Sequence, residues 1–259
     1  MTGHDDFGVL ARYYDAMMKH VDYDTWFLKL RIMEELLAPR PLHADMACGT
    51  GALMNKLRER GWRSFGTDLS RAMVRQARQR ERNLPVAVAD MRAQPFHERF
   101  DVVTCLFDSL NFLTEETDLR QAFREMAAMT RDGGLLYFDI ITERMVMVHF
   151  AGQRWTEQNG RFSTTWESEY NRAAQLAETR VTINRGQAQP IRERIYPPEL
   201  VKEAAQDAGL HVAGMFDAVN WKKPLKRTLR VDFAAFKNPA PETLTRFKTI
   251  ARKIRLWLR

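Results

Sequence analysis

Between residues 42 and 141 the chain alternates between short apolar runs and helix-like segments, and this alternation limits the fold more than any other feature. Short apolar runs bounded by turn residues predict strands, and apolar residues spaced three or four apart predict helices. Strands that alternate with helices form a parallel sheet with right-handed crossovers. The predicted strands cover residues 42–47, 62–67, 85–89, 100–106 and 135–141, and the predicted helices cover 52–60, 70–82 and 117–130.

The flanking segments show other patterns. The first forty residues have helical spacing, and Asp24 is placed to cap the second of two helices. Residues 153–196 alternate with a period of two around Asn159-Gly160, which is typical of a type I′ hairpin, so we expect a small antiparallel sheet there. A helix over 197–208 and strands over 211–216 and 229–236 complete a predicted α/β fold. The predicted domains are an N-terminal helical lid (1–40), a main domain (41–238) with an antiparallel insertion at about 152–196, and a C-terminal helix (239–259).

The positive charge lies near the C-terminal end. Residues 221–259 hold 12 Lys and Arg against 2 Asp and Glu, a net charge of +10, which leaves −3 for the rest of the chain. After Pro241 the apolar and basic residues fall on opposite sides of a predicted amphipathic helix. Such a helix can meet RNA, an anionic membrane or an acidic partner, or it can pack back on the domain with a solvated basic face. Both interpretations stay open.

Several classes are disfavoured by composition. No apolar run is long enough for a transmembrane helix, and the N-terminus does not read as a secretory signal. Only Cys48 and Cys105 are present, which fits a reducing compartment, and no His or Cys cluster has the spacing of a metal site. We therefore expect a cytoplasmic protein without a metal.

The sequence Asp45-Met-Ala-Cys-Gly-Thr-Gly51 follows the first predicted strand and opens a helix. Glycines at the carboxyl edge of a parallel sheet let a ligand approach the backbone closely. A dinucleotide site would have a third Gly or Ala three residues later, where this chain has Met54. S-adenosylmethionine (SAM) has no pyrophosphate, and an acidic strand end followed by small residues suits its amino acid tail and sulfonium.

Carboxylates end the next two strands. Asp68 can accept hydrogen bonds from both ribose hydroxyls, and Ser70 is the better cap for the helix that follows. Asp90 can accept from an adenine amino group while Met91 covers the ring. After the fourth strand, the segment that starts Leu106-Phe107-Asp108 should form the wall between adenine and the transferable methyl.

The segments DMACGTG, GTDLS, ADMRAQPF and FDVVTCLFDSLNFL occur in this order, and the chain resembles the class I SAM-dependent methyltransferases over about residues 40–145. The early YYDAMMKHVDYDTW resembles the start of a bacterial subgroup with small-molecule and sugar N-methyltransferase relatives. The resemblance implies a Rossmann-like, seven-stranded, mostly parallel sheet with helices on both faces, with SAM as cofactor and S-adenosylhomocysteine as product. The implied cofactor-binding residues are Tyr14, Trp26, Asp45, Ala47, Cys48, Gly49, Gly51, Asp68, Leu69, Met73, Asp90, Met91, Leu106, Phe107 and Asp108.

The chain also departs from some relatives of that class. Amino-directed nucleic-acid base methyltransferases usually carry an Asn/Asp-Pro-Pro-aromatic element, and this chain has Asp108-Ser-Leu-Asn111 instead. Methyl transfer from a sulfonium needs alignment and desolvation more than a base. The candidates for orienting the nucleophile are Tyr14, Asp108 and Asn111. The insertion aromatics either roof the acceptor pocket, make a dimer contact or form their own small core; they are Trp155, Phe162, Trp166 and Tyr170.

Three function classes follow. The favoured one is a methyltransferase with a small-molecule acceptor, as a monomer or homodimer. The second is an RNA or protein methyltransferase that uses the basic C-terminal segment, although nucleic acid is not favoured as a partner. The third is a SAM-binding or nicotinamide-binding protein with another activity.

Overall fold

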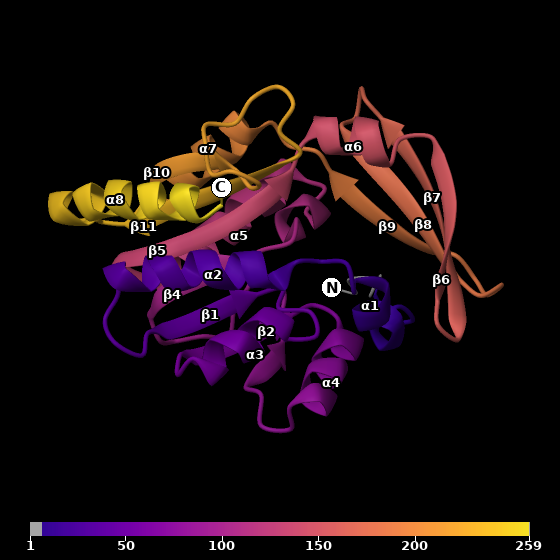
Figure 1. Cartoon of the computed structure of the whole chain (residues 1–259), viewed down its shortest axis with the longest axis horizontal. Helices are drawn as coiled ribbons and strands as arrows, with labels where there is room; N and C mark the ends of the chain where they lie inside the picture. Colours follow the sequence, from indigo (N-terminus) through magenta and orange to yellow (C-terminus); the bar gives the residue numbers. More distant parts are fainter. Residues whose placement is uncertain (1–6, 259) are drawn as a thin grey trace.

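Seven strands form the central sheet of the computed structural model, which describes residues 7–258. Their order is β10-β11-β5-β4-β1-β2-β3, and β11 runs antiparallel to both of its neighbours, as Figure 1 lets the reader follow. This confirms the predicted fold class. The strands are β1 (Leu42–Met46), β2 (Arg63–Asp68), β3 (Val86–Val88), β4 (Phe100–Cys105), β5 (Thr130–Ile141), β10 (Leu210–Asp217) and β11 (Arg230–Lys237).

Helices cover both faces of this sheet. On one face pack α5 (Glu116–Met129) and α7 (Pro198–Asp207), and on the other pack α2 (Tyr23–Met33), α3 (Ala52–Glu59) and α8 (Pro241–Trp257). α4 (Arg71–Arg80) packs on β2 and β3. Ser70 caps α4 by accepting a hydrogen bond from the Met73 N–H at 3.2 Å, as the sequence predicted. The cap predicted for α2 was wrong: Asp22, not Asp24, accepts from the Thr25 N–H at 3.1 Å.

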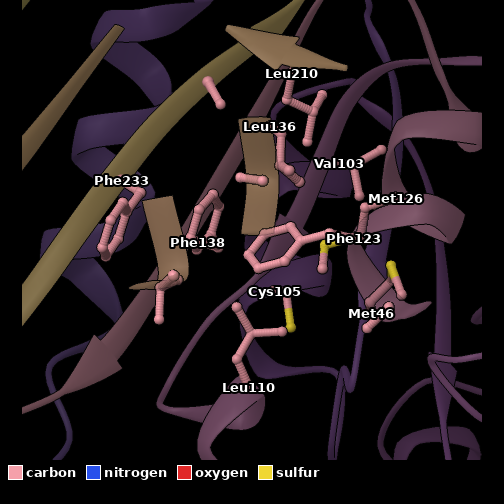
Figure 2. Close-up of a cluster of buried hydrophobic side chains, with 14 of the residues drawn as sticks. Met46, Val103, Cys105, Leu110, Phe123, Met126, Leu136, Phe138, Leu210 and Phe233 are labelled. Carbon is pink, nitrogen blue, oxygen red and sulfur yellow. The ribbon is translucent and has the colours of Figure 1, made fainter. Parts of the chain in front are cut away.

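The core between β5 and α5 consists of fully buried apolar side chains. Figure 2 shows Phe123 and Met126 of α5 meeting Leu136 and Phe138 of β5, with Phe138 stacked on Phe233 at 4.7 Å between ring centroids. Apolar residues on both faces of β4 and β5 are what a strand buried on both sides requires. This packing fixes the carboxyl ends of the central strands, where the candidate site lies.

A second, four-stranded antiparallel sheet stands beside the first (Figure 1). Its strands are β6 (Gln153–Asn159), β7 (Phe162–Asn171), β8 (Leu176–Ile183) and β9 (Gln189–Arg194), and the Asn159-Gly160 hairpin joins β6 to β7. A short helix that the sequence did not reveal, α6 (Glu143–His149), leads from β5 to it. One face of this sheet packs on α1 (Ala11–Met17) through Leu10, Met17, Val181, Ile183 and Ile191.

The N-terminal helices and α8 also have defined places. α1 packs against the second sheet, α2 lies on one face of the central sheet, and α8 buries Phe247, Ile250, Ala251 and Ile254. The division into lid, main domain and C-terminal helix at residues 40 and 238 stays a prediction. No helix within residues 7–258 is long and apolar enough to span a bilayer.

Candidate active site

A cavity of about 570 Å³ lies where the carboxyl ends of β1, β2 and β4 meet the second sheet. Its walls hold nearly all of the residues predicted to bind the cofactor. They are Tyr14, Trp26, Asp45, Ala47, Cys48, Gly49, Asp68, Leu69, Met73, Asp90, Met91, Leu106, Phe107 and Asp108. Open α/β sheets bind their ligands at this edge. The residues come from five separate stretches of the chain, so the fold, not the sequence order, brings them together.

The glycine loop turns sharply between β1 and α3. Ala47, Gly49 and Gly51 have φ values of 55°, 54° and 73°, a left-handed conformation that glycine adopts most easily. A Cβ on Gly49 would meet nothing within 4 Å, so the backbone there is open to a ligand. Gly51 does not line the cavity; it lies behind the loop, where a Cβ would approach Leu84 Cδ2 to 2.5 Å. Its role is the close packing of α3.

Asp68 joins the loop to the end of β2. Its Oδ2 accepts from the Gly49 N–H and its Oδ1 from the Ser70 N–H, both at 2.8 Å. The carboxylate thus fixes the glycine loop while lining the cavity beside Leu69 and Met73. Charged hydrogen bonds of this kind are the strong ones in proteins.

Asp45 lies beneath the loop and is 5% exposed. Burial raises the pKa of its carboxyl to about 7, although a 2.5 Å hydrogen bond from the Thr104 hydroxyl opposes this and Asp68 adds to it. Thr104 also contacts Nε2 of the buried His43, whose pKa falls to about 3 because burial disfavours its charged form. The imidazole of His43 is therefore neutral. A cationic ligand near Asp45 would favour the ionised form of its carboxyl.

Asp90 and Met91 lie at the end of the third strand, as predicted, and both line the cavity. The Asp90 carboxylate is paired with Arg92, with Oδ2 at 2.5 Å from Nη2, and Arg92 also pairs with Asp118 at 2.7 Å. Hydrogen bonds from Arg92 lower the pKa of Asp90. Arg92 donates to both carboxylate oxygens, through its backbone N–H and Nε to Oδ1 and through Nε and Nη2 to Oδ2, and these bonds orient the carboxylate.

The far side of the cavity contains charges that the sequence did not reveal. Arg230, at the start of β11, contacts Asp108 Oδ1 at 2.6 Å and Asp139 Oδ1 at 2.9 Å. Asp139 in turn accepts from the backbone N–H groups of Phe107 and Asp108, at 3.2 and 2.7 Å. Both of these residues have positive φ, 61° and 54°, a strained conformation that Asp139 stabilises. Burial raises the pKa of Asp139 to about 6, with Arg230 opposing.

Tyr14 and Trp26 close this side from the N-terminal helices. Burial raises the pKa of Tyr14, and so do nearby Tyr23, Asp108 and Asp68. The Arg230 guanidinium lies 5.8 Å from the Trp26 ring and 5.3 Å from the Phe107 ring. Tyr23 was not among the predicted residues, although it lies one helical turn before Trp26, a spacing that would have indicated it.

Asn111 does not reach the cavity. It is fully buried; its amide nitrogen donates to the Arg194 carbonyl at 2.8 Å and its amide oxygen accepts from the Ile141 N–H at 3.1 Å. With both ends of the amide committed, Asn111 ties β9 to the end of β5. Its role in orienting the nucleophile stays a prediction, although Asn111 is not among the residues that line the cavity.

The insertion aromatics divide between the alternatives that the sequence left open. Trp155 and Trp166 line the cavity, and their rings are stacked, with 5.7 Å between the ring centroids and an interplanar angle of 3°. Phe162 packs on Tyr13 at 4.6 Å, and Tyr170 joins the cluster around α6. Part of the insertion therefore roofs the cavity and part forms apolar packing with α1 and α6. Within residues 7–258, no group of three or more His, Cys, Asp or Glu side chains could hold a metal ion.

Known proteins match both the sequence and this geometry. Residues 44–134 match a family described as a methyltransferase domain. YqeM of Bacillus subtilis, a protein named only provisionally as a methyltransferase, is 31% identical over 162 residues, which cover 61% of this chain and 64% of YqeM. A Saccharopolyspora spinosa protein named dTDP-4-amino-2,3,4,6-tetradeoxy-D-glucose N,N-dimethyltransferase is 36% identical over 91 residues, 35% of this chain and 36% of that protein. A solved SAM-dependent methyltransferase from Clostridium acetobutylicum superposes with a TM-score of 0.77 at 23% identity, covering 89% of this chain and 98% of that one.

The chain therefore has the fold of a solved SAM-dependent methyltransferase, as the sequence predicted. Residues 44–134 match the methyltransferase domain of the family model. The matches span less than two thirds of the length of both curated relatives, 64% and 36%.

Proposed function

We propose that the chain transfers the methyl group of SAM to a small-molecule acceptor by in-line displacement. The observation that carries the proposal is the extent of the cavity. It runs from the glycine loop and Asp68, past Phe107 and Asp108, to the underside of the β6–β9 sheet. A roofed cavity of this size suits a nucleoside together with a small acceptor.

The residues fit the cofactor. Asp68 would accept from the ribose hydroxyls, Asp90 from the adenine amino group, and Asp45 would face the cationic amino acid tail above the open backbone of Gly49. The raised pKa of Asp45, about 7, leaves a carboxyl whose ionised form a cation stabilises. A nicotinamide dinucleotide would need space for a pyrophosphate, which this loop does not favour because Met54 is at the third glycine position and is fully buried.

The chain itself contributes alignment and exclusion of water. When bound, SAM supplies a methyl group that is already activated by its positive sulfur. Tyr14, Trp26 and Phe107 line the cavity. Tyr14 and Trp26 would cover the site from the N-terminal side, and Phe107 would separate the nucleoside from the acceptor. Tyr14 and Asp108 remain the proposed groups for orienting the acceptor. Holding two reactants in line supplies much of the rate acceleration of such a transfer.

An RNA or protein acceptor has less support. Its main basis in the sequence was the basic C-terminal segment, and the apolar stripe of α8 is buried against the central sheet. A cytoplasmic location and a monomeric or homodimeric state stay predictions.

The test is calorimetry with S-adenosylhomocysteine on the wild type and on Asp68→Ala. We expect the variant to bind about 2–4 kcal/mol more weakly, because charged hydrogen bonds to the ribose are lost. Asp132→Ala is the control, since Asp132 is exposed and bonds Asn238 at the amino end of β5. Wild type that takes up NAD and not the nucleoside, or an Asp68→Ala variant with unchanged affinity, would overturn the proposal.

A further inference from the structure

Glu193 of β9 has a buried carboxylate oxygen without a hydrogen-bond partner. The side chain lines the cavity on the side of the second sheet, and its Oε1 is among the few buried side-chain atoms of residues 7–258 that nothing in the chain satisfies. Buried polar atoms are nearly always hydrogen-bonded, and an exception needs an explanation. A carboxylate oxygen can only be satisfied by a donor, so its position in the cavity wall indicates a ligand N–H or O–H.

The surroundings of Glu193 are acidic. Burial raises the pKa of Glu193, and so does nearby Asp108, with Arg230 opposing. Arg230 is already shared, because it pairs with Asp108 and with Asp139. The carboxyl groups of Glu193, Asp108 and Asp139 thus lie around this guanidinium, and a further positive charge entering the cavity would be stabilised.

We infer that Glu193 binds the nucleophilic nitrogen of the methyl acceptor, and that the acceptor is an amine. The inference rests on the proposed function. An amine nitrogen gains positive charge as it attacks, which neighbouring carboxylates stabilise. A hydroxyl acceptor must instead develop negative charge, which the same carboxylates oppose. Asp108 and Glu193 both line the cavity and lie near each other, so a nitrogen held by Glu193 would stand near the segment after β4.

The bonds and protons balance with groups in the cavity. The nitrogen lone pair forms the new C–N bond while the C–S bond breaks, and the sulfur keeps the electron pair as S-adenosylhomocysteine. The methylated nitrogen then carries one positive charge and one N–H proton in excess. Because burial and Asp108 raise the pKa of Glu193, its carboxyl first releases its own proton to solvent, and Arg230 favours the resulting carboxylate. This carboxylate accepts the proton of the methylated nitrogen and releases it to solvent when the product departs. Glu193 is then ready for another cycle.

The stacked rings of Trp155 and Trp166 indicate what kind of group the acceptor carries besides its amine. Both rings line the cavity on the same sheet as Glu193, and an apolar or planar portion can pack against them. The acceptor class is therefore an amine attached to an apolar or ring-shaped body that fits beneath the second sheet.

The experiment measures transfer from radiolabelled SAM to three amines, each paired with the alcohol of the same skeleton. The pairs are glycine with glycolate, tyramine with tyrosol, and the dTDP-4-amino sugar named for the Saccharopolyspora relative with its 4-hydroxy analogue. We expect at least one amine to be methylated and none of the alcohols. Transfer to an alcohol, or to no amine while S-adenosylhomocysteine still binds, would contradict the amine assignment.

Variants test Glu193 itself. In Glu193→Gln we expect kcat for the accepted amine to fall roughly 100-fold, in the range of a lost general base, while S-adenosylhomocysteine binds as in the wild type. Glu193→Asp should recover part of the rate. The matched control is Glu178→Gln on neighbouring β8, whose carboxylate pairs with Arg192 outside the cavity. Full turnover in Glu193→Gln would overturn the role of Glu193; loss of nucleoside binding in the wild type would instead overturn the proposed function.

Discussion

At the scale of single residues, Asp45 shows how a carboxyl that suits a cationic ligand can lower the stability of the folded protein when no ligand is bound. An aspartate in an unfolded chain ionises near pH 4, whereas the buried Asp45 does so only near pH 7. The folded state therefore loses stability from this group as the pH rises from about 4 to 7. A bound cation would recover that loss, since it favours the ionised carboxyl.

Asp45→Asn should therefore raise the free energy of unfolding of the ligand-free protein at pH 8 by up to roughly 4 kcal/mol, and its melting temperature should rise accordingly. At pH 4 the gain should vanish, because the wild-type carboxyl is then neutral as well. Scanning calorimetry at both pH values checks this. We expect the S-adenosylhomocysteine affinity of the wild type to rise as the pH increases through 7, and the same variant should lose this rise. A wild-type affinity that is flat across this range would contradict the argument.

Residues also show where sequence reasoning succeeded and where it failed. Asp68, Asp90 and Asp108 each end a strand of a parallel sheet, so the local pattern was enough to place them at one edge. Asn111 lies in the same segment as Asp108, but the direction of its side chain depends on contacts with β5 and β9. Glu193 lies on β9 of the second sheet and Arg230 on β11 of the central sheet, and no local pattern indicates that the two side chains line the same cavity.

At the scale of elements, α2 is tied to the sheet by a buried ion pair. Lys29 Nζ lies 2.7 Å from Asp232 Oδ2, and the same oxygen accepts from the Tyr137 hydroxyl at 2.7 Å and the Trp221 indole at 2.9 Å. Lys29 also donates to the Ala218 carbonyl at 2.8 Å. Both charged groups are essentially unexposed, 1% and 0%. Since α2 carries Tyr23 and Trp26, this pair positions one wall of the cavity.

Lys29→Met should lower the free energy of unfolding by about 3–5 kcal/mol, because it leaves the Asp232 carboxylate charged and buried without a cation. Urea unfolding monitored by circular dichroism measures the change. A second substitution, Asp232→Asn, should restore part of the loss by removing the unpaired charge. Lys19→Met is the control, since Lys19 is exposed. Equal stability of Lys29→Met and wild type would show that the pair does not anchor α2.

The element pattern was largely predictable from periodicity. Strands buried on both faces, such as β4, are nearly continuous apolar runs, and the Asn159-Gly160 hairpin signalled the second sheet. α6 was missed because seven residues give too short a period to recognise. How the second sheet packs on α1 could not be predicted either, because that contact joins segments more than 160 residues apart, as Leu10 with Val181.

At the scale of the whole molecule, α8 is a structural part of the core. Phe247 is 2% exposed and its ring lies 5.4 Å from Phe236 and 6.1 Å from Phe216. Basic residues on the other side of the helix, such as Lys248 and Arg252, are exposed. Of the two interpretations of this segment, packing on the domain is the one observed.

Phe247→Ala should therefore destabilise the protein by about 3–5 kcal/mol, the usual cost of a large core aromatic, while Lys248→Ala should change stability little. Thermal unfolding of both variants measures the difference. Removal of the whole helix should unfold or aggregate the protein, because it would uncover the apolar face of the sheet. A truncated chain that melts like the wild type would contradict this account.

The cavity is shared between two parts of the chain that differ in architecture. Apart from Tyr14 and Trp26, the residues proposed to hold the nucleoside come from loops of the parallel sheet, whereas Trp155, Trp166 and Glu193 come from a separate antiparallel sheet that follows α6 in the chain. Mutations in the β6–β9 sheet can accumulate without weakening the binding of the methyl donor. Descendants of such a chain can thus diversify in what they modify while the donor chemistry is inherited intact.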